Sequence, residues 1–353
     1  MKLSNLALLI EGISFLLIGG IPAVFNFMDM QGFPYPLPTS LFNAHWIVMV
    51  YGFFLTLIGN EILVALSNEW RGRPAPKVYI AVTGVSALIA VIMSELNLIP
   101  YSLYVLLLPI GTLIFYSRVY LSPSKLGLKP TTYNYLLFIT LIITVFVISF
   151  QTVMDIPWVS LVFPSLTIFA IMSRDIGLVF GGKKINGEEM TLAYLSLLLG
   201  IVTYPTYASS LFLFLSWVFS LHGSGILRSK GRLYPRVSLS IAWTWLLLSS
   251  LFSLLSYDAF VHSIAVGFLF DTVFGVDAVL MDMLIGISGK RLSIRPSYLP
   301  IILLNIGLSM RIAYDLGISS SLFIASAPLQ GIGILSFYLN VFRQVLPQLK
   351  SSV

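Results

Sequence analysis

Apolar segments about 20 residues long recur along the whole chain, and only short polar gaps separate them. Each is long enough to cross the hydrocarbon core of a bilayer as a helix. Only 10% of the 353 residues are charged, whereas soluble domains carry about 25%. The sequence therefore predicts one all-α integral membrane domain over residues 1–353, with the lipid bilayer as its surroundings.

The segments number about twelve, which predicts a polytopic bundle of transmembrane helices. Lys and Arg cluster in every second gap, for example at Arg71 and Arg73, and are missing from the gaps between. Because basic loops stay on the cytoplasmic side, both termini are expected in the cytoplasm of a multi-pass plasma-membrane protein. The expected spans are residues 3–25, 42–66, 78–98, 101–121, 134–154, 157–180, 190–206, 208–227, 235–256, 259–285, 298–315 and 319–343.

Charge and cysteine content exclude several classes of protein. The net charge of +6 comes from basic loops that orient the chain, so no nucleic-acid partner is expected. The chain has no cysteine, which excludes disulfides, thiolate metal sites and covalently attached haem. The Met residues are scattered and give no argument for copper, although copper is not excluded.

Two of the three histidines, His45 and His262, lie near the outer starts of the second and tenth expected spans, and so at similar depth. Two neutral imidazoles at one depth can hold a haem iron from its two sides. Gly52 and Gly267 could let a flat macrocycle approach, and Asp258, one turn before His262, could accept its other ring N–H. The alternative is that these histidines only form hydrogen bonds between helices.

Arg311 lies inside the eleventh expected span, one turn before Asp315. A charge at that depth needs a partner. A haem propionate is one candidate, and an ion pair with Asp315 near the outer interface is the other.

Acidic residues inside expected spans form a second candidate set. Their spacing on the tenth span places some of them near one face of a helix, where they could relay protons or bind a cation. They could equally pair with Arg118 or Arg174. The set is Glu11, Glu61, Asp271, Asp277 and Asp282.

The stretch Asn43–Phe53 resembles the His-x-x-x-Met-x-x-Gly-Phe segment of the NnrS family of haem- and copper-containing membrane proteins. The segment His262–Gly267 and the helix exit Gly286–Arg291 are similar to later motifs of that family. The resemblance implies about twelve helices and bound haem. Motif-level matching covers only the second and tenth spans and their exits.

A looser resemblance is to the main subunit of haem–copper oxidases, in which histidines of helices 2 and 10 hold a low-spin haem. That resemblance implies His45 and His262 as axial ligands and Arg311 near the propionates. The sixth and seventh spans lack histidine, so no copper–haem oxygen-reducing site, and no enzymatic activity of that kind, is expected. In composition the chain is also similar to the polytopic membrane component of archaeal cytochrome b558/566 complexes.

These observations predict a membrane component of a respiratory electron-transfer chain that binds haem b, with a cytochrome or Rieske protein as redox partner. Two alternatives stay open. One is a haem-free membrane anchor for an external cytochrome, and the other is a proton- or ion-coupled transporter.

Overall fold

The computed structural model describes residues 6–30, 32, 44–179, 185–229, 231–284, 295–319 and 322–350. These residues form helices, turns and loops, and no strand occurs among them. They group into two compact units. Unit 1 comprises the described residues within 1–167 and 281–284, and unit 2 comprises those within 168–280 and 295–350.

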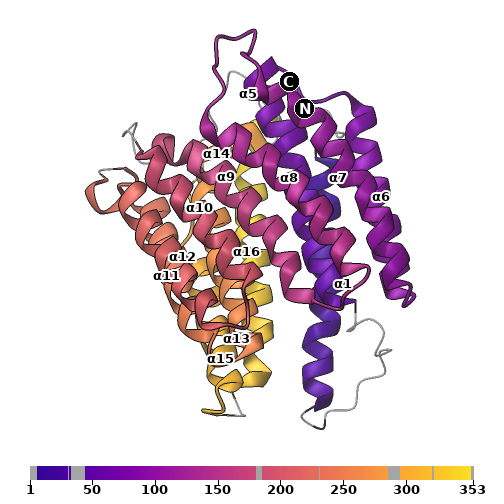
Figure 1. Cartoon of the computed structure of the whole chain (residues 1–353), viewed down its shortest axis with the longest axis vertical. Coiled ribbons are helices and arrows are strands. Elements are labelled where there is room, and N and C mark those ends of the chain that lie inside the picture. Colours follow the sequence, from indigo (N-terminus) through magenta and orange to yellow (C-terminus); the bar gives the residue numbers. More distant parts are fainter. Residues whose placement is uncertain are drawn as a thin grey trace. The chain divides into compact units, whose positions relative to one another are not determined.

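Unit 1 begins with a long helix, and its helices α6, α7 and α8 follow one another side by side (Figure 1). The run from His45 to Arg71 is one continuous helix that changes its hydrogen-bond pattern along its length. The elements are α1 (Ala7–Met30), α3 (His45–Ile47), η2 (Val48–Phe54), α4 (Leu55–Asn60), η3 (Glu61–Leu66), α5 (Ser67–Arg71), α6 (Lys77–Glu95), α7 (Ile99–Ser117), η4 (Arg118–Leu121), α8 (Thr132–Gln151) and η5 (Pro157–Leu161).

Unit 2 contains neighbouring helix pairs, α10 with α11 and α15 with α16 (Figure 1). Helix α9 (Val162–Val179) begins in unit 1 and continues in unit 2. The remaining elements are α10 (Gly187–Val202), α11 (Tyr207–Gly223), η6 (Ile226–Arg228), α12 (Leu233–Phe252), α13 (Tyr257–His262), η7 (Ser263–Phe268), α14 (Leu269–Leu284), α15 (Leu299–Asp315) and α16 (Phe323–Lys350).

Within the described residues, nine helices are long and apolar enough to cross a membrane. The chain is therefore a multi-pass helical membrane protein. Each of the expected spans contains a helix. However, α10 and α15 have only 16 and 17 residues, fewer than the about 20 that a perpendicular span needs. The count of about twelve transmembrane helices and the cytoplasmic position of the termini stay predictions.

Local signals fix several helix starts. Asn186 caps α10 by accepting hydrogen bonds from two first-turn N–H groups, and Ser256 caps α13 by accepting one from Ala259. Thr131 and Asn134 form a reciprocal cap at the start of α8. These side chains satisfy N–H groups that have no partner inside the helix.

The helices that carry His45 and His262 are among the most enclosed. In the most apolar stretch of each, 89% and 78% of the residues are buried, against 33% in α11. Most side chains of these two helices therefore face other parts of the protein, and polar groups buried among them must be satisfied within the protein.

Candidate functional site

Among the described residues, three π-helical segments interrupt the α-helices, and each begins at or just after an ionisable residue. Segment η2 begins three residues after His45, η3 begins at Glu61, and η7 begins directly after His262. A π-helical turn is rare, is less favourable than an α-helical turn and is frequent at functional sites. The backbone thus departs from regular geometry next to residues that sequence reasoning selected.

In unit 1, the His45 imidazole is anchored to another helix. Its Nδ1 lies 2.9 Å from the carbonyl oxygen of Gly19 in α1. A carbonyl only accepts, so Nδ1 is the donor and, in a neutral ring, Nε2 carries the lone pair. Pro22 follows three residues later inside α1 and lacks the N–H that would bond the carbonyl of Ile18, the residue before Gly19. The imidazole therefore bonds a carbonyl in the turn that the proline interrupts.

In unit 2, the His262 imidazole is anchored within its own helix. Its Nδ1 lies 2.9 Å from the carbonyl oxygen of Asp258 and 3.3 Å from Oδ1 of the same residue. The proton on Nδ1 therefore points to Asp258, which again assigns the lone pair of a neutral ring to Nε2. The contact that the sequence suggested between these two residues is present. Its role in holding a metal-bound ring stays a prediction.

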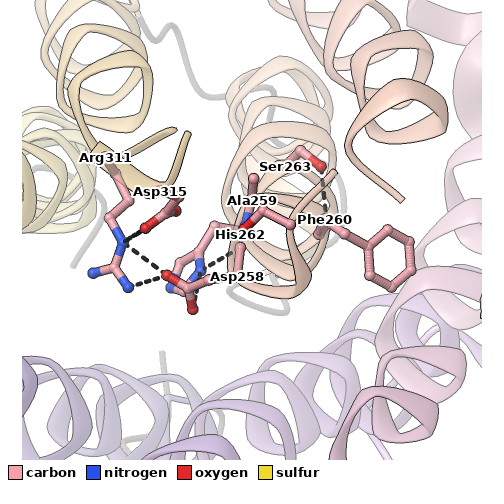
Figure 2. A network of polar contacts seen from close by, with 8 residues as sticks. Asp258, Ala259, Phe260, His262, Ser263, Arg311 and Asp315 are labelled. Carbon is pink, nitrogen blue, oxygen red and sulfur yellow. Dashed lines mark hydrogen bonds and ion pairs between the residues drawn. The ribbon is translucent and has the colours of Figure 1, made fainter. Parts of the chain in front are cut away.

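Asp258 also joins His262 to an arginine on another helix. Figure 2 shows the Arg311 guanidinium facing the carboxylates of Asp258 and Asp315. Arg311 Nε lies 2.9 Å from Asp258 Oδ2 and 3.1 Å from Asp315 Oδ1, and Arg311 Nη2 bonds the same Asp258 oxygen. Phe323 covers the guanidinium, with its ring centre 4.8 Å from the Arg311 Cζ. The Asp258–His262–Arg311–Asp315 set is called the outer network below.

The outer network explains how Arg311 can be buried. Its side chain is 7% exposed and that of Asp315 is 4% exposed, whereas the side chain of Asp258 is 36% exposed. Two carboxylates and one guanidinium share hydrogen bonds, and the imidazole adds a further donor. The ion pair with Asp315, one of the two alternatives from sequence, is present. A propionate partner for Arg311 stays a prediction.

The two glycines predicted near the haem pack against side chains. A Cβ on Gly52 would lie 3.1 Å from Phe15 and from Val91. A Cβ on Gly267 would have three atoms of Trp245 within 2.8 Å. On the side where a Cβ would point, the space beside each glycine is therefore used for close helix packing. Their part in binding a macrocycle stays a prediction.

A second polar cluster lies deeper in unit 2, around Asp271 on α14. Asp271 is completely buried, and its Oδ1 accepts a hydrogen bond of 3.1 Å from Asn305 on α15. Trp245 Nε1 donates to the Asn305 amide oxygen, and Ser238 donates to the Asp271 carbonyl. Among the described residues, Asp271 Oδ2 has no hydrogen-bond partner. We call Asp271, Asn305, Trp245 and Ser238 the inner network.

The other predicted acids lie in separate places. Glu11 on α1 faces Gly84 of α6, since a Cβ there would meet the Glu11 carboxylate, and Glu61 begins η3 and is half-buried. Asp277 is buried on α14, and the Asp282 side chain lies outside the part of the chain described. Arg174 contacts Asp175 at 3.2 Å, and its pairing with the predicted acids stays a prediction.

Sequence reasoning missed Asn305 and Trp245. The available signal was Asn305 itself, an amide inside an otherwise apolar segment, because such a side chain in a membrane helix usually forms a hydrogen bond to another helix. Nothing in the local sequence indicated which partner it had. The remaining histidine, His222, is exposed, and its Nδ1–H donates to the carboxylate of Glu189 between α11 and α10.

No protein-family model and no curated protein matches this chain. In the described residues, no group of three or more His, Asp or Glu side chains could hold a metal ion. A haem iron held by two imidazoles would not need such a group. The haem assignment therefore depends on each histidine's own surroundings.

Proposed function

We propose that this multi-pass protein is a component of a respiratory electron-transfer chain in the plasma membrane, and that it binds haem b through His45 and His262. One observation carries the proposal: each imidazole donates its Nδ1–H to a backbone carbonyl. This contact fixes the ring and assigns the lone pair to Nε2, as in most metal-bound histidines. The haem would supply the redox chemistry, and the chain would supply ligands, orientation and a low-dielectric environment.

In this proposal the outer network positions His262. Asp258 holds the ring through Nδ1, Arg311 donates to Asp258, and Asp315 accepts a further hydrogen bond from Arg311. A carboxylate behind a histidine increases the basicity of the ligating nitrogen. The same charges would also set the electrostatic environment of a nearby iron.

The test is the absorption spectrum of the protein purified after expression with added haem. We expect a six-coordinate b-type spectrum that changes in His45→Ala and in His262→Ala, because each substitution removes one axial ligand. His222→Ala is the matched control, since this exposed histidine pairs with Glu189 and is outside the proposed site. Absence of haem absorbance, or equal spectra in all three variants, would refute haem ligation by these residues.

A redox protein of the cytochrome or Rieske type is the proposed partner. Co-purification of such a protein with a pigment-free chain would replace the haem proposal by a haem-free membrane anchor. Finding a pigmented chain that reduces or oxidises the partner would support the first proposal.

We also infer about twelve transmembrane helices with cytoplasmic termini. The absence of cysteine from the chain allows a direct test with single introduced cysteines. An impermeant maleimide added to intact cells should label Val153→Cys, in the loop after α8 that has no basic residue, and leave Leu126→Cys unlabelled. Both positions are exposed. If Leu126→Cys were labelled and Val153→Cys were not, the termini would lie on the outer side of the membrane.

A second candidate function, proton- or cation-coupled transport, is favoured by the inner network. A buried carboxylate oxygen without a hydrogen-bond donor is costly at membrane depth and is a natural place for a proton or cation. In proteoliposomes, Asp271→Asn and Asp277→Asn should abolish ion-dependent flux, whereas Asp155→Asn in an exposed loop should not. Unchanged flux in the two α14 variants would exclude this route.

A further inference from the structure

A pocket of about 370 Å³ opens at one end of unit 2, between the starts of α12 and α15 and the α14 helix. It lies outside both networks described above. Its lining includes two arginines and two tyrosines, together with small apolar residues. The lining residues are Arg232, Tyr234, Pro235, Ala278, Val279, Arg295, Pro296 and Tyr298.

Two helices begin at this pocket. Arg232 is the residue that precedes α12, and Tyr298 is the residue that precedes α15, and neither side chain caps its helix. The positive end of each helix dipole therefore adds to the two guanidinium charges. The pocket concentrates positive potential in a concave space, which suits a compact anion.

The position of Arg295 is fixed by the chain. Its backbone N–H donates to the Gln344 side-chain oxygen at 2.8 Å, and the Gln344 side-chain amide donates back to the Arg295 carbonyl at 3.0 Å. This reciprocal pair ties the loop before α15 to α16. The Arg295 side chain is exposed and available at the pocket, as is that of Arg232.

The rest of the lining has a different character. The rings of Tyr234 and Tyr298 lie 5.2 Å apart, and Tyr234 is only 5% exposed. Val279, Ala278 and two prolines supply apolar surface beside them. Tyrosines at helix ends are typical of the membrane–water interface. An anion that also carries an apolar portion would therefore fit better than an isolated ion.

The surrounding sequence favours the same ligand. The pocket is next to basic segments, with Arg228 and Arg236 near Arg232, and the loop charges place this end at the cytoplasmic surface. Anionic lipids gather there, and basic pockets between membrane helices bind their headgroups. The nearest acidic residue in sequence, Asp277, is buried and does not line the pocket.

We propose that this pocket binds the phosphate group of an anionic lipid headgroup, with Arg232 and Arg295 contacting the phosphate. The apolar lining would accept the glycerol and the first methylenes. A soluble phosphate shares the charged part of this chemistry but cannot use the apolar part.

The experiment measures binding to the purified full-length protein in detergent at fixed ionic strength, by native mass spectrometry and by thermophoresis. The probes are short-chain phosphatidylglycerol, phosphatidylcholine with the same chains, and inorganic phosphate. We expect phosphatidylglycerol to bind more tightly than the other two. Because both guanidinium contacts to the phosphate are lost, the R232Q/R295Q variant should lose at least about tenfold in affinity.

The matched control is R73Q/K129Q, which removes two exposed charges from basic loops of unit 1. It should bind phosphatidylglycerol as the unaltered protein does. Equal loss in both double variants, or equal binding of the two lipids, would overturn the proposal. Inorganic phosphate binding as tightly as phosphatidylglycerol would assign the pocket to a soluble phosphate instead. If the double variant unfolds, the single variants R232Q and R295Q provide the same comparison.

Discussion

Unit 2 contains two polar networks on one helical run, Tyr257–Leu284, and they compensate their carboxylates differently. In the outer network, the Asp258 carboxylate receives bonds from a guanidinium and lies beside the His262 ring, and it is 36% exposed. In the inner network, Asp271 is fully buried and its only side-chain donor among the described residues is a neutral amide. One network matches charge with charge, and the other leaves a carboxylate oxygen without a donor in the part of the chain that the structure describes.

This difference predicts opposite effects of substitutions on the stability of the fold. Charges that are paired and hydrogen-bonded stabilise the fold only while every partner remains. A buried carboxylate without a full set of hydrogen-bond donors destabilises the folded protein. Such a residue is retained where the function needs an ionisable group. We therefore expect substitutions in the outer network to lower the stability of the folded protein. Neutralising Asp271 should leave that stability unchanged or raise it slightly.

The largest effect is expected for Arg311→Met. The substitution leaves Asp258 and Asp315 facing each other without a cation, and breaking a buried pair in this way costs about 3 kcal/mol. Thermal and denaturant unfolding in detergent would measure the loss. Arg118→Met is the control, because that arginine is exposed and contacts only the Phe115 ring among the contacts described for it; its effect should stay below about 1 kcal/mol. Equal losses would mean that the outer network is not a special source of stability.

A smaller loss, about 2 kcal/mol, is expected for Gly267→Ala. The added methyl group would force Trp245 aside, because three of its atoms lie within 2.8 Å of the new Cβ. Moving this indole also weakens its hydrogen bond to Asn305 in the inner network. In α16, Gly331→Ala adds a methyl group with nothing within 4 Å, and it should be neutral or slightly stabilising. Tolerance of alanine at position 267 would contradict the close packing.

Asn305→Leu should cost about 1 to 2 kcal/mol. The amide is both the donor to Asp271 and the acceptor for Trp245, so the substitution leaves two buried polar groups without partners. Combining it with Asp271→Leu should recover part of the loss, because one of those groups is then gone. Strict additivity of the two substitutions in unfolding measurements would show that the pair is not coupled.

The smallest change in stability, within about 1 kcal/mol and in the stabilising direction, is expected for Asp271→Asn. The new amide oxygen can still accept the Asn305 hydrogen bond, and no buried carboxylate remains. A clear destabilisation in the unfolding midpoint would show that the charged form is compensated in the folded protein. It would also remove the main argument that Asp271 is retained as an ionisable group for proton or cation transport.

The helices could be read from the sequence because their signal is local. Twenty consecutive apolar residues define a span without knowledge of any other part of the chain, and each expected range contains a helix. The contact between Asp258 and His262 was also readable, since residues four apart share a helix face. The π-helical turns after His45 and His262 could not be read, because they arise from packing and not from a residue pattern.

What the sequence by itself determined is the class of protein: an apolar, multi-pass helical chain whose few polar residues inside the spans are candidates for function. What only the tertiary structure decided is which of those residues meet. Arg311 reaches Asp258 across 53 positions of sequence, and Asn305 joins Asp271 to Trp245 from another helix. The physical reason is that hydrophobicity acts residue by residue, whereas a buried charge must be satisfied by whichever donor the packing of helices places beside it.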